Sequence, residues 1–235
     1  MLKIYPAEKR VNRNHGWLNA RFSFSFADYY DPDNTEFGPL RVFNDDIVQP
    51  ATGFGMHGHR EMEIVTVVLR GKLQHKDSMG NTEIIEPGQI QRMSAGTGIM
   101  HSEINPMTDE ELNLLQLWFE PNVKGLQPSY EMISYDRETM KNKLLPIVSG
   151  RLPESPGTGK IHQDMTIYLS ELEPGQQIIF EQDANRRIYI CDIEGELTLN
   201  GEHQLKRRDA VRATDLPHCT IGSDTGATLM LIDLP

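Results

Sequence analysis

Two short histidine motifs hold the residues of this sequence best suited to chemistry. His57 and His59 stand two apart just before an apolar run, and His101 and Glu103 repeat that spacing after the glycine-rich turn at residues 96–98. Residues two apart on a β-strand point to the same face. If the two strands face each other, three imidazoles and one carboxylate meet at one point. This donor set predicts a metal site with positions left open for substrate or oxygen.

A surface loop is the alternative interpretation of either histidine pair taken alone. A single His-x-His pair is more often surface decoration or part of a hydrogen-bonded loop than a metal site. The second pair, with matching spacing in a different segment, favours metal binding. The residue types suit a divalent first-row metal, Fe(II) first, with Mn, Co, Ni or Cu as alternatives.

The elements that must position these residues are short strands. Runs rich in branched or aromatic residues, bounded by Gly, Pro, Asn or Asp, predict strands at residues 62–69, 114–119, 177–180, 187–191 and 229–231. Only residues 136–143 and 109–113 have a helical pattern, and both segments are short. Many short strands with glycine-rich turns predict an all-β sandwich or barrel.

The chain is long enough for one large domain or two small ones. Residues 148–160 (VSGRLPESPGTGK) contain three Gly and two Pro without apolar periodicity, which is typical of a linker or a loop between two β units. The segments RGKL at Arg70–Leu73 and EGEL at Glu194–Leu197 each follow a branched strand, which indicates an internal duplication. We expect a metal-binding domain at residues 1–147 and a degenerate one at 148–235.

Composition excludes several classes of partner. The 235 residues include 23 Lys and Arg against 34 Asp and Glu, a formal charge of −11. This balance argues against direct nucleic-acid binding and against an anionic membrane surface. No apolar run is long enough to span a membrane and no signal peptide is expected. Two cysteines are too few for a disulfide framework, so we expect a cytoplasmic protein, and we expect it to be a monomer.

The residues around the histidine pairs resemble the pirin family of bicupins. The resemblance is carried by GFGMHGHREMEIVTVVLRGKLQHKDSMGN (53–81) and QRMSAGTGIMHSE (91–103), and by NHGWLNARFSFSFADYYDPDN (14–34) and FEPNVKGLQPSYE (119–131). It runs from about residue 12 to 135 and then weakens to a generic second cupin. It implies an all-β bicupin fold of two packed, jelly-roll-like barrels with a few short helices.

The resemblance also implies the metal ligands. They fall on His57, His59, His101 and Glu103, all unsubstituted. Gly58 departs from the pattern, because pirins often carry Pro between the two histidines; a glycine loosens the loop without removing a ligand. Glu63 stands where other cupins have their carboxylate metal ligand, and we interpret it as a structural residue or one that supports a ligand.

Bacterial proteins that this sequence resembles imply a flavonol 2,3-dioxygenase (quercetinase) activity. The flavonol and O2 would be the substrates, carbon monoxide and a depside the products, and Glu103 the general base. Two alternatives stay open. One is a metal-switched regulatory protein that binds a protein partner without turnover. The other is a different cupin enzyme, acting on another enol.

Other residues favour structural roles. With Gly71 aligned to Gly195, Glu181 and Asp183 stand where His57 and His59 do, and we expect a solvated edge there rather than a second metal site. The histidines of the second half, His162, His203 and His218, have no common spacing and are expected at the surface. His75 and Asp77 are expected to close a hairpin. Cys191 is expected in the core, and Cys219 beside His218 is a candidate low-pKa thiol. Trp17, Phe22, Phe24 and Phe26 alternate as in a strand and are expected to pack one barrel face.

Overall fold

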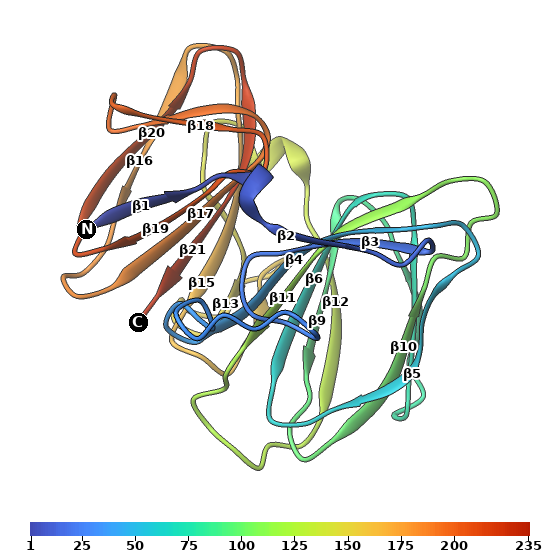
Figure 1. The fold of residues 1–235 in the computed structure, drawn as a ribbon. Helices are drawn as coiled ribbons and strands as arrows, with labels where there is room; N and C mark the ends of the chain where they lie inside the picture. The colour runs from blue at the N-terminus through green and yellow to red at the C-terminus, as the bar shows by residue number, and fades with distance from the viewer. The chain divides into compact units, whose positions relative to one another are not determined.

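The computed structural model describes residues 1–235 and consists almost entirely of β-strands joined by turns (Figure 1). The only helical elements are two short 3-10 helices, η1 (Ala7–Lys9) and η2 (Arg137–Met140). The second begins where Asp136 caps the backbone N–H of Glu138 at 2.9 Å. The all-β expectation is confirmed. No helix here has the length and apolar character needed to cross a membrane.

The helix expected at residues 109–113 is wrong. Strand β11 (Leu112–Phe119) already begins at Leu112, and its leucines at positions 112 and 114 are both fully buried. Because residues two apart share a face of a strand, these two leucines lie on the core side only in extended backbone. Burial in the sheet therefore overrides the local helical pattern.

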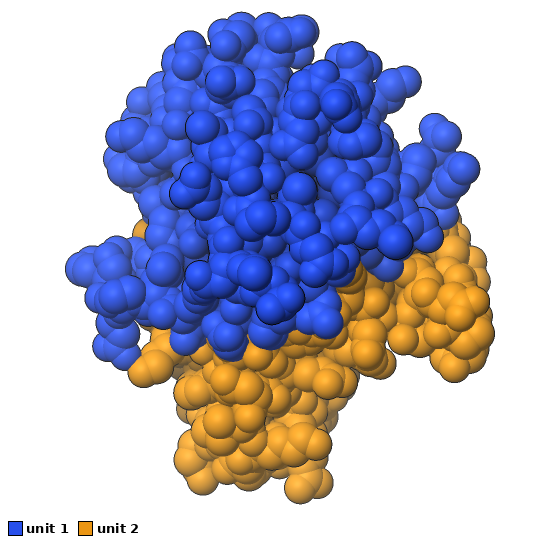
Figure 2. Space-filling view, turned by 90° about the vertical axis from the view of Figure 1, so that its left-hand side faces the viewer, with its two compact units in different colours: residues 1–10, 135–158, 164–235 blue, residues 11–134, 159–163 orange.

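Contacts divide the chain into two compact units, coloured separately in Figure 2. Unit 1 contains residues 1–10, 135–158 and 164–235, and unit 2 contains residues 11–134 and 159–163. Residues 1–10 join unit 1 because β1 (Leu2–Tyr5) pairs with β19 (Ala210–Thr214). The domain boundary after residue 147 stays a prediction.

Unit 2 consists of two antiparallel sheets that do not close into one continuous barrel. The larger sheet has the order β12 (Ser129–Ser134), β9 (Gln89–Ser94), β6 (Glu63–Arg70), β11, β4 (Leu40–Val48), β3 (Leu18–Phe22) and β2 (Val11–Asn14). The smaller has the order β5 (Gly53–His59), β10 (Ile99–Ile104), β7 (Leu73–Asp77) and β8 (Thr82–Ile85). β14 (Gly159–Lys160) belongs to the short second segment of this unit.

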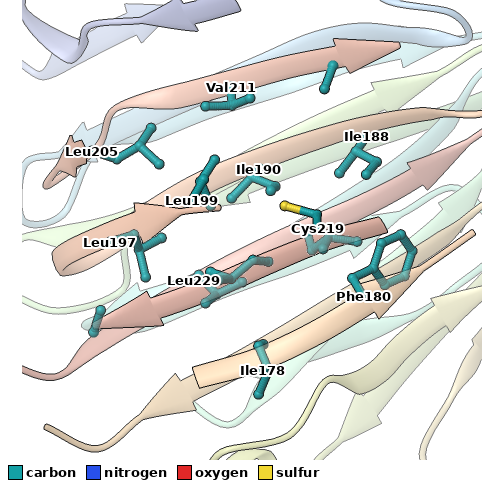
Figure 3. Close-up of a cluster of buried hydrophobic side chains, with 14 of the residues drawn as sticks. Ile178, Phe180, Ile188, Ile190, Leu197, Leu199, Leu205, Val211, Cys219 and Leu229 are labelled. Atoms are coloured by element: carbon teal, nitrogen blue, oxygen red, sulfur yellow. The ribbon is translucent and has the colours of Figure 1, made fainter. Parts of the chain in front are cut away.

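Unit 1 is built on the long strand β17 (Arg187–Leu199). This strand pairs with β19 and with β21 (Ala227–Leu234), and β21 pairs in turn with β15 (Thr166–Leu172), which pairs with β13 (Leu145–Ser149). The C-terminal part of β17 pairs with β18 (His203–Lys206) and β20 (His218–Ser223), and β20 pairs with β16 (Gln176–Glu181). Apolar side chains from these strands form one buried cluster (Figure 3).

Each unit contains the same glycine corner. Strand β6 carries one extra residue two positions before Gly71, and β17 carries one two positions before Gly195. Both glycines have positive φ, +77° and +102°, and a Cβ would lie 2.6 Å and 2.4 Å from the carbonyl oxygen of the residue just before the neighbouring strand. Only glycine fits either position. The shared bulge and corner support the internal duplication and fix which residues of the two units are equivalent.

Candidate metal centre

Strands β5 and β10 bring three histidines together. The two strands pair antiparallel with His57 directly opposite His101, and His59 lies two residues along on the same face. The ligand nitrogens of His57, His59 and His101 all lie within 4.8 Å of one another. Their ring centroids are 4.4 Å apart for His57 and His101, and 4.9 Å apart for the other two pairs. The predicted convergence of these imidazoles is therefore present.

Glu103 follows on the same strand, beyond a register shift between His101 and Glu103 on β10. Its carboxylate is buried and accepts hydrogen bonds from two amides, Gln91 Nε2 at 3.1 Å and Gln116 Nε2 at 2.8 Å. Thr66 Oγ1 is 3.5 Å from the same oxygen as Gln91. Two amide donors thus hold the Glu103 carboxylate in place inside the unit. Its metal ligation stays a prediction.

His59 and His101 are held in the neutral form that metal ligation requires. Burial, followed by the charges of His57 and His75, lowers the pKa of His101 to about 3. Burial, followed by His101 and His57, lowers the pKa of His59 to about 4. His57 Nδ1 lies 2.8 Å from the carbonyl oxygen of Gly55. The proton therefore sits on Nδ1, which donates a hydrogen bond to that oxygen, and the lone pair of Nε2 is left for a metal ion.

A divalent transition-metal ion fits these residues. Both ring nitrogens of His101 are buried without any hydrogen-bond partner. A buried polar atom left unpartnered costs about 1–3 kcal/mol, so such atoms call for an explanation. A cation between three neutral imidazoles would satisfy one of these nitrogens, and imidazole donors with a nearby carboxylate suit first-row metals.

Aromatic rings border the histidines on two strands. The Trp118 ring packs edge-to-face on His59 at 4.7 Å and on Phe26 at 5.3 Å. Phe54 lies 6.3 Å from His57, with Trp17 packed edge-on behind it at 5.1 Å. The expected packing role of the N-terminal aromatics is confirmed, since Phe22 belongs to a buried cluster against which Trp17 and Phe26 pack, and Phe24 is buried as well. Trp118 was missed, because nothing in its local sequence indicates which strand it will face.

His75 has a second role beside the one expected. Asp77 closes the hairpin, since its Oδ1 accepts the backbone N–H groups of Met79 and Asn81 at 2.9 and 3.0 Å. Its Oδ2 lies 3.0 Å from His75 Nε2. The His75 ring, however, is also 5.4 Å from His101 and stacks on Tyr130 at 4.4 Å. It therefore forms part of the wall behind the histidine cluster.

Glu63 lies outside the histidine cluster. Its buried carboxylate accepts a hydrogen bond from Ser94 Oγ at 2.8 Å, and burial raises its pKa. Its position fits the structural role expected for it.

The equivalent region of unit 1 is a solvated edge. Glu181 is exposed and lies 3.7 Å from exposed His218, its register partner on the neighbouring strand, and Asp183 pairs with Arg151. His218 is thus at the surface as expected, but it is placed opposite Glu181 by strand pairing. The low-pKa interpretation of Cys219 is wrong, because burial raises the pKa of its thiol to about 11.

Comparisons with known proteins agree with this architecture. The sequence model described as Pirin matches residues 5–119, and the model described as Quercetinase C-terminal cupin domain matches residues 147–234. A protein of Escherichia coli strain K12 named quercetin 2,3-dioxygenase is 40% identical, over 100% of this chain and 99% of its own. The chain belongs to the pirin family. The expected pirin resemblance and bicupin fold are confirmed.

Solved pirin structures superpose on the whole chain. The crystal structure of YhhW from Escherichia coli has a TM-score of 0.94 at 40% identity, covering 100% of this chain and 98% of that one. The structure of that bacterial pirin in complex with nickel(II) has a TM-score of 0.93 at 39% identity, covering 100% and 99%. A relative is therefore known to hold a divalent transition metal.

Proposed function

We propose that this pirin is a metal-dependent dioxygenase that cleaves a flavonol such as quercetin, with the metal held by His57, His59, His101 and Glu103. The observation that carries the proposal is the partly buried three-histidine cluster with its unpartnered His101 nitrogens. It occurs in a chain 40% identical over its whole length to a protein named quercetin 2,3-dioxygenase. When bound, a divalent transition metal supplies Lewis-acid and redox chemistry for an enol and O2. Fe(II) is our first choice, and Mn, Co, Ni and Cu also suit the donors.

Glu103 is the group of this chain suited to move a proton. The flavonol 3-hydroxyl must lose its proton before the ring becomes electron-rich enough to react with O2, and a carboxylate at hydrogen-bond reach serves as general base. Hydrogen bonds from Gln91 and Gln116 fix both carboxylate oxygens in place. The proton of the 3-hydroxyl passes to a Glu103 oxygen, and ring cleavage then gives carbon monoxide and a depside.

The rings beside the histidines suit a flat aromatic substrate. Trp118 borders His59 and Phe54 borders His57, and both aromatic residues are only partly buried. Aromatic rings bind planar ligands by stacking and edge-to-face contact, and they keep water from the reacting atoms. A flavonol, with its fused rings and 3-hydroxyl, combines such a surface with a group that a metal can take.

The test is loss of the quercetin absorption band together with O2 uptake, using protein loaded with Fe(II) and, in parallel, with Mn, Co, Ni and Cu. We expect metal-dependent turnover in the wild type and its loss in Glu103→Gln, which keeps the side chain's size while removing the base. If the wild type binds metal but turns over no flavonol with any of these ions, the proposal fails. The metal-switched protein partner would then become the leading account.

A further inference from the structure

Trp118 contacts His59 of the candidate metal centre and is linked to Glu103 through Gln116. Its ring packs on His59, and its indole Nε1–H donates a hydrogen bond of 3.1 Å to Gln116 Oε1. Gln116 Nε2 then donates a hydrogen bond of 2.8 Å to Glu103 Oε2. The two residues share a face of β11 because they stand two apart. The result is a continuous chain of hydrogen bonds from an indole to a buried carboxylate.

The direction of this chain is set by the indole. A primary amide can turn either its oxygen or its nitrogen to a neighbour, and its partners decide which. An indole N–H can only donate, so it binds Gln116 Oε1 and turns Nε2 toward Glu103. With the amide reversed, Oε1 would face the Glu103 carboxylate and the two sets of lone pairs would repel.

The second amide on Glu103 has no such anchor. Gln91 Nε2 donates to Glu103 Oε1, but Gln91 Oε1 is buried without a hydrogen-bond partner. The orientation of Gln91 therefore depends on Glu103 itself. Of the two amides that hold the carboxylate, only that of Gln116 is oriented by a residue outside the pair.

We propose that Trp118 is a positioning residue: its indole N–H, acting through Gln116, holds Glu103 in the orientation needed at the metal centre. This inference goes beyond the proposed function and rests on it only for the metal role of Glu103. It predicts that the indole N–H affects metal affinity although it is not itself a ligand. Loss of such an outer partner typically weakens metal binding about 10- to 100-fold.

A double-mutant cycle with Ni²⁺ alone as the probe tests this chain of hydrogen bonds from Trp118 through Gln116 to Glu103, here called the relay. The dissociation constant is measured by competition with a chromophoric chelator for the wild type, Trp118→Phe, Gln116→Leu and the double variant. We expect each single variant to bind Ni²⁺ about 10-fold more weakly. The double variant should bind no more weakly than Gln116→Leu, because the indole acts only through that amide. Trp17→Phe, an aromatic exchange in the same unit, is the matched control and should stay within about two-fold of the wild type.

Two results would overturn the relay. One is a Trp118→Phe affinity within about two-fold of the wild type, and the other is a double variant whose loss equals the product of the single losses. The second result would mean that Trp118 acts by packing on His59. No Ni²⁺ binding by the wild type would overturn both the relay and the metal site. A further result is possible: the wild type binds Ni²⁺ and the double variant binds it no more weakly than Gln116→Leu, but no flavonol is turned over. That result would support the relay and contradict only the proposed reaction.

Thermal unfolding of the metal-free variants checks that each one folds. If Trp118→Phe does not fold, β-(3-benzothienyl)alanine is incorporated at position 118 in the Trp17→Phe background. This side chain keeps the two-ring shape and lacks the N–H. The expected loss of Ni²⁺ affinity is again about 10-fold, and unchanged affinity would contradict the relay.

Discussion

The two units carry opposite kinds of side chain at the same interior positions. In unit 2, Thr66 stands five residues before the corner glycine and is paired with Gln91 on one side and Gln116 on the other. These three polar residues surround the Glu103 carboxylate.

The equivalent three positions in unit 1 are apolar. The residue five before its corner glycine is Ile190, which is paired with Val211 and Leu231. All three belong to the buried cluster, where Figure 3 labels the first two. One strand scaffold therefore supports either a polar site or a packed core, and three paired positions decide between them.

The strands that carry the histidines differ in the same way. The inward side chains at the end of β16 are Ile178 and Phe180, while Glu181 is exposed. Aligning the corner glycines makes Glu181 the equivalent of His57, but Glu181 lies on the outward face of its strand. In a strand a shift of one residue exchanges the two faces, so unit 1, which has no histidines on this strand, also has its polar position facing outward.

The largest effect is expected where the two units differ most, at the histidine cluster. We expect His101→Ala to weaken Ni²⁺ binding about 1,000-fold, more than the loss of an outer partner costs, since it would remove a proposed ligand. The matched control is His218→Ala, at an exposed histidine of unit 1, which should leave the affinity unchanged. Calorimetric titration of the metal-free proteins measures both. Equal losses in the two variants would contradict a single site in unit 2.

Exchanging the three polar positions for those of unit 1 tests the comparison directly. We expect Thr66→Ile with Gln91→Val and Gln116→Leu to reduce the free energy of unfolding of the metal-free protein by about 3 kcal/mol, because a buried carboxylate loses its donors. Adding Glu103→Leu should restore most of that loss. Urea unfolding measures it. A triple variant as stable as the wild type would mean that the donors do not hold the carboxylate.

Asp192 is a fully buried carboxylate of unit 1. It stands three residues before Gly195, where unit 2 has Val68, and neither of its carboxylate oxygens has a hydrogen-bond partner. Burial, followed by Asp209 and Glu194, raises its pKa from 3.8 to about 7. The folded state therefore favours the protonated form. This contribution to stability is complete below pH 4 and is lost as the pH rises to about 7.

We therefore expect Asp192→Val to remove a pH-dependent change of about 2 kcal/mol in the free energy of unfolding, a value reduced from the full pKa shift to allow for solvent screening. The variant should gain stability over the wild type between pH 4.5 and pH 8, measured by urea unfolding at both values. The exposed Asp224→Asn is the control and should show a constant difference. A constant difference for Asp192→Val as well would mean that Asp192 ionises normally.

The smallest expected effect concerns Gly58, between the two histidines. Its backbone is not in the left-handed region, and an added Cβ would lie 2.9 Å from Sδ of the flexible Met100 side chain and 3.7 Å from the Ile99 carbonyl oxygen. Gly58→Ala should stabilise the protein by about 0.5 kcal/mol, because the unfolded chain loses freedom. Thermal unfolding measures the gain, and Gly71→Ala is the contrasting variant, since its Cβ would collide with backbone. A destabilised Gly58→Ala would show that Met100 cannot move aside.

Local sequence was enough for the five strands predicted from their composition and for the histidine cluster. The alternation of His57 with His59 and of His101 with Glu103 carries its own geometry, because the period of a strand is two. The same reasoning could not find Gln91 or Gln116. Their signal is the register between β6, β9 and β11, and one sequence does not state which strands pair. The error at residues 109–113 has the same cause.

The sequence by itself determined the donor atoms of this protein and the corner glycines that shape each unit, since residue type and two-residue spacing are properties of the chain. The tertiary structure alone decided that His101 is buried without a partner, that Trp118 reaches Glu103 through Gln116, and that Glu181 faces solvent beside His218. These features depend on strand pairing and on which face of a strand is inward. Both are fixed by burying apolar surface across the whole unit rather than by any local segment.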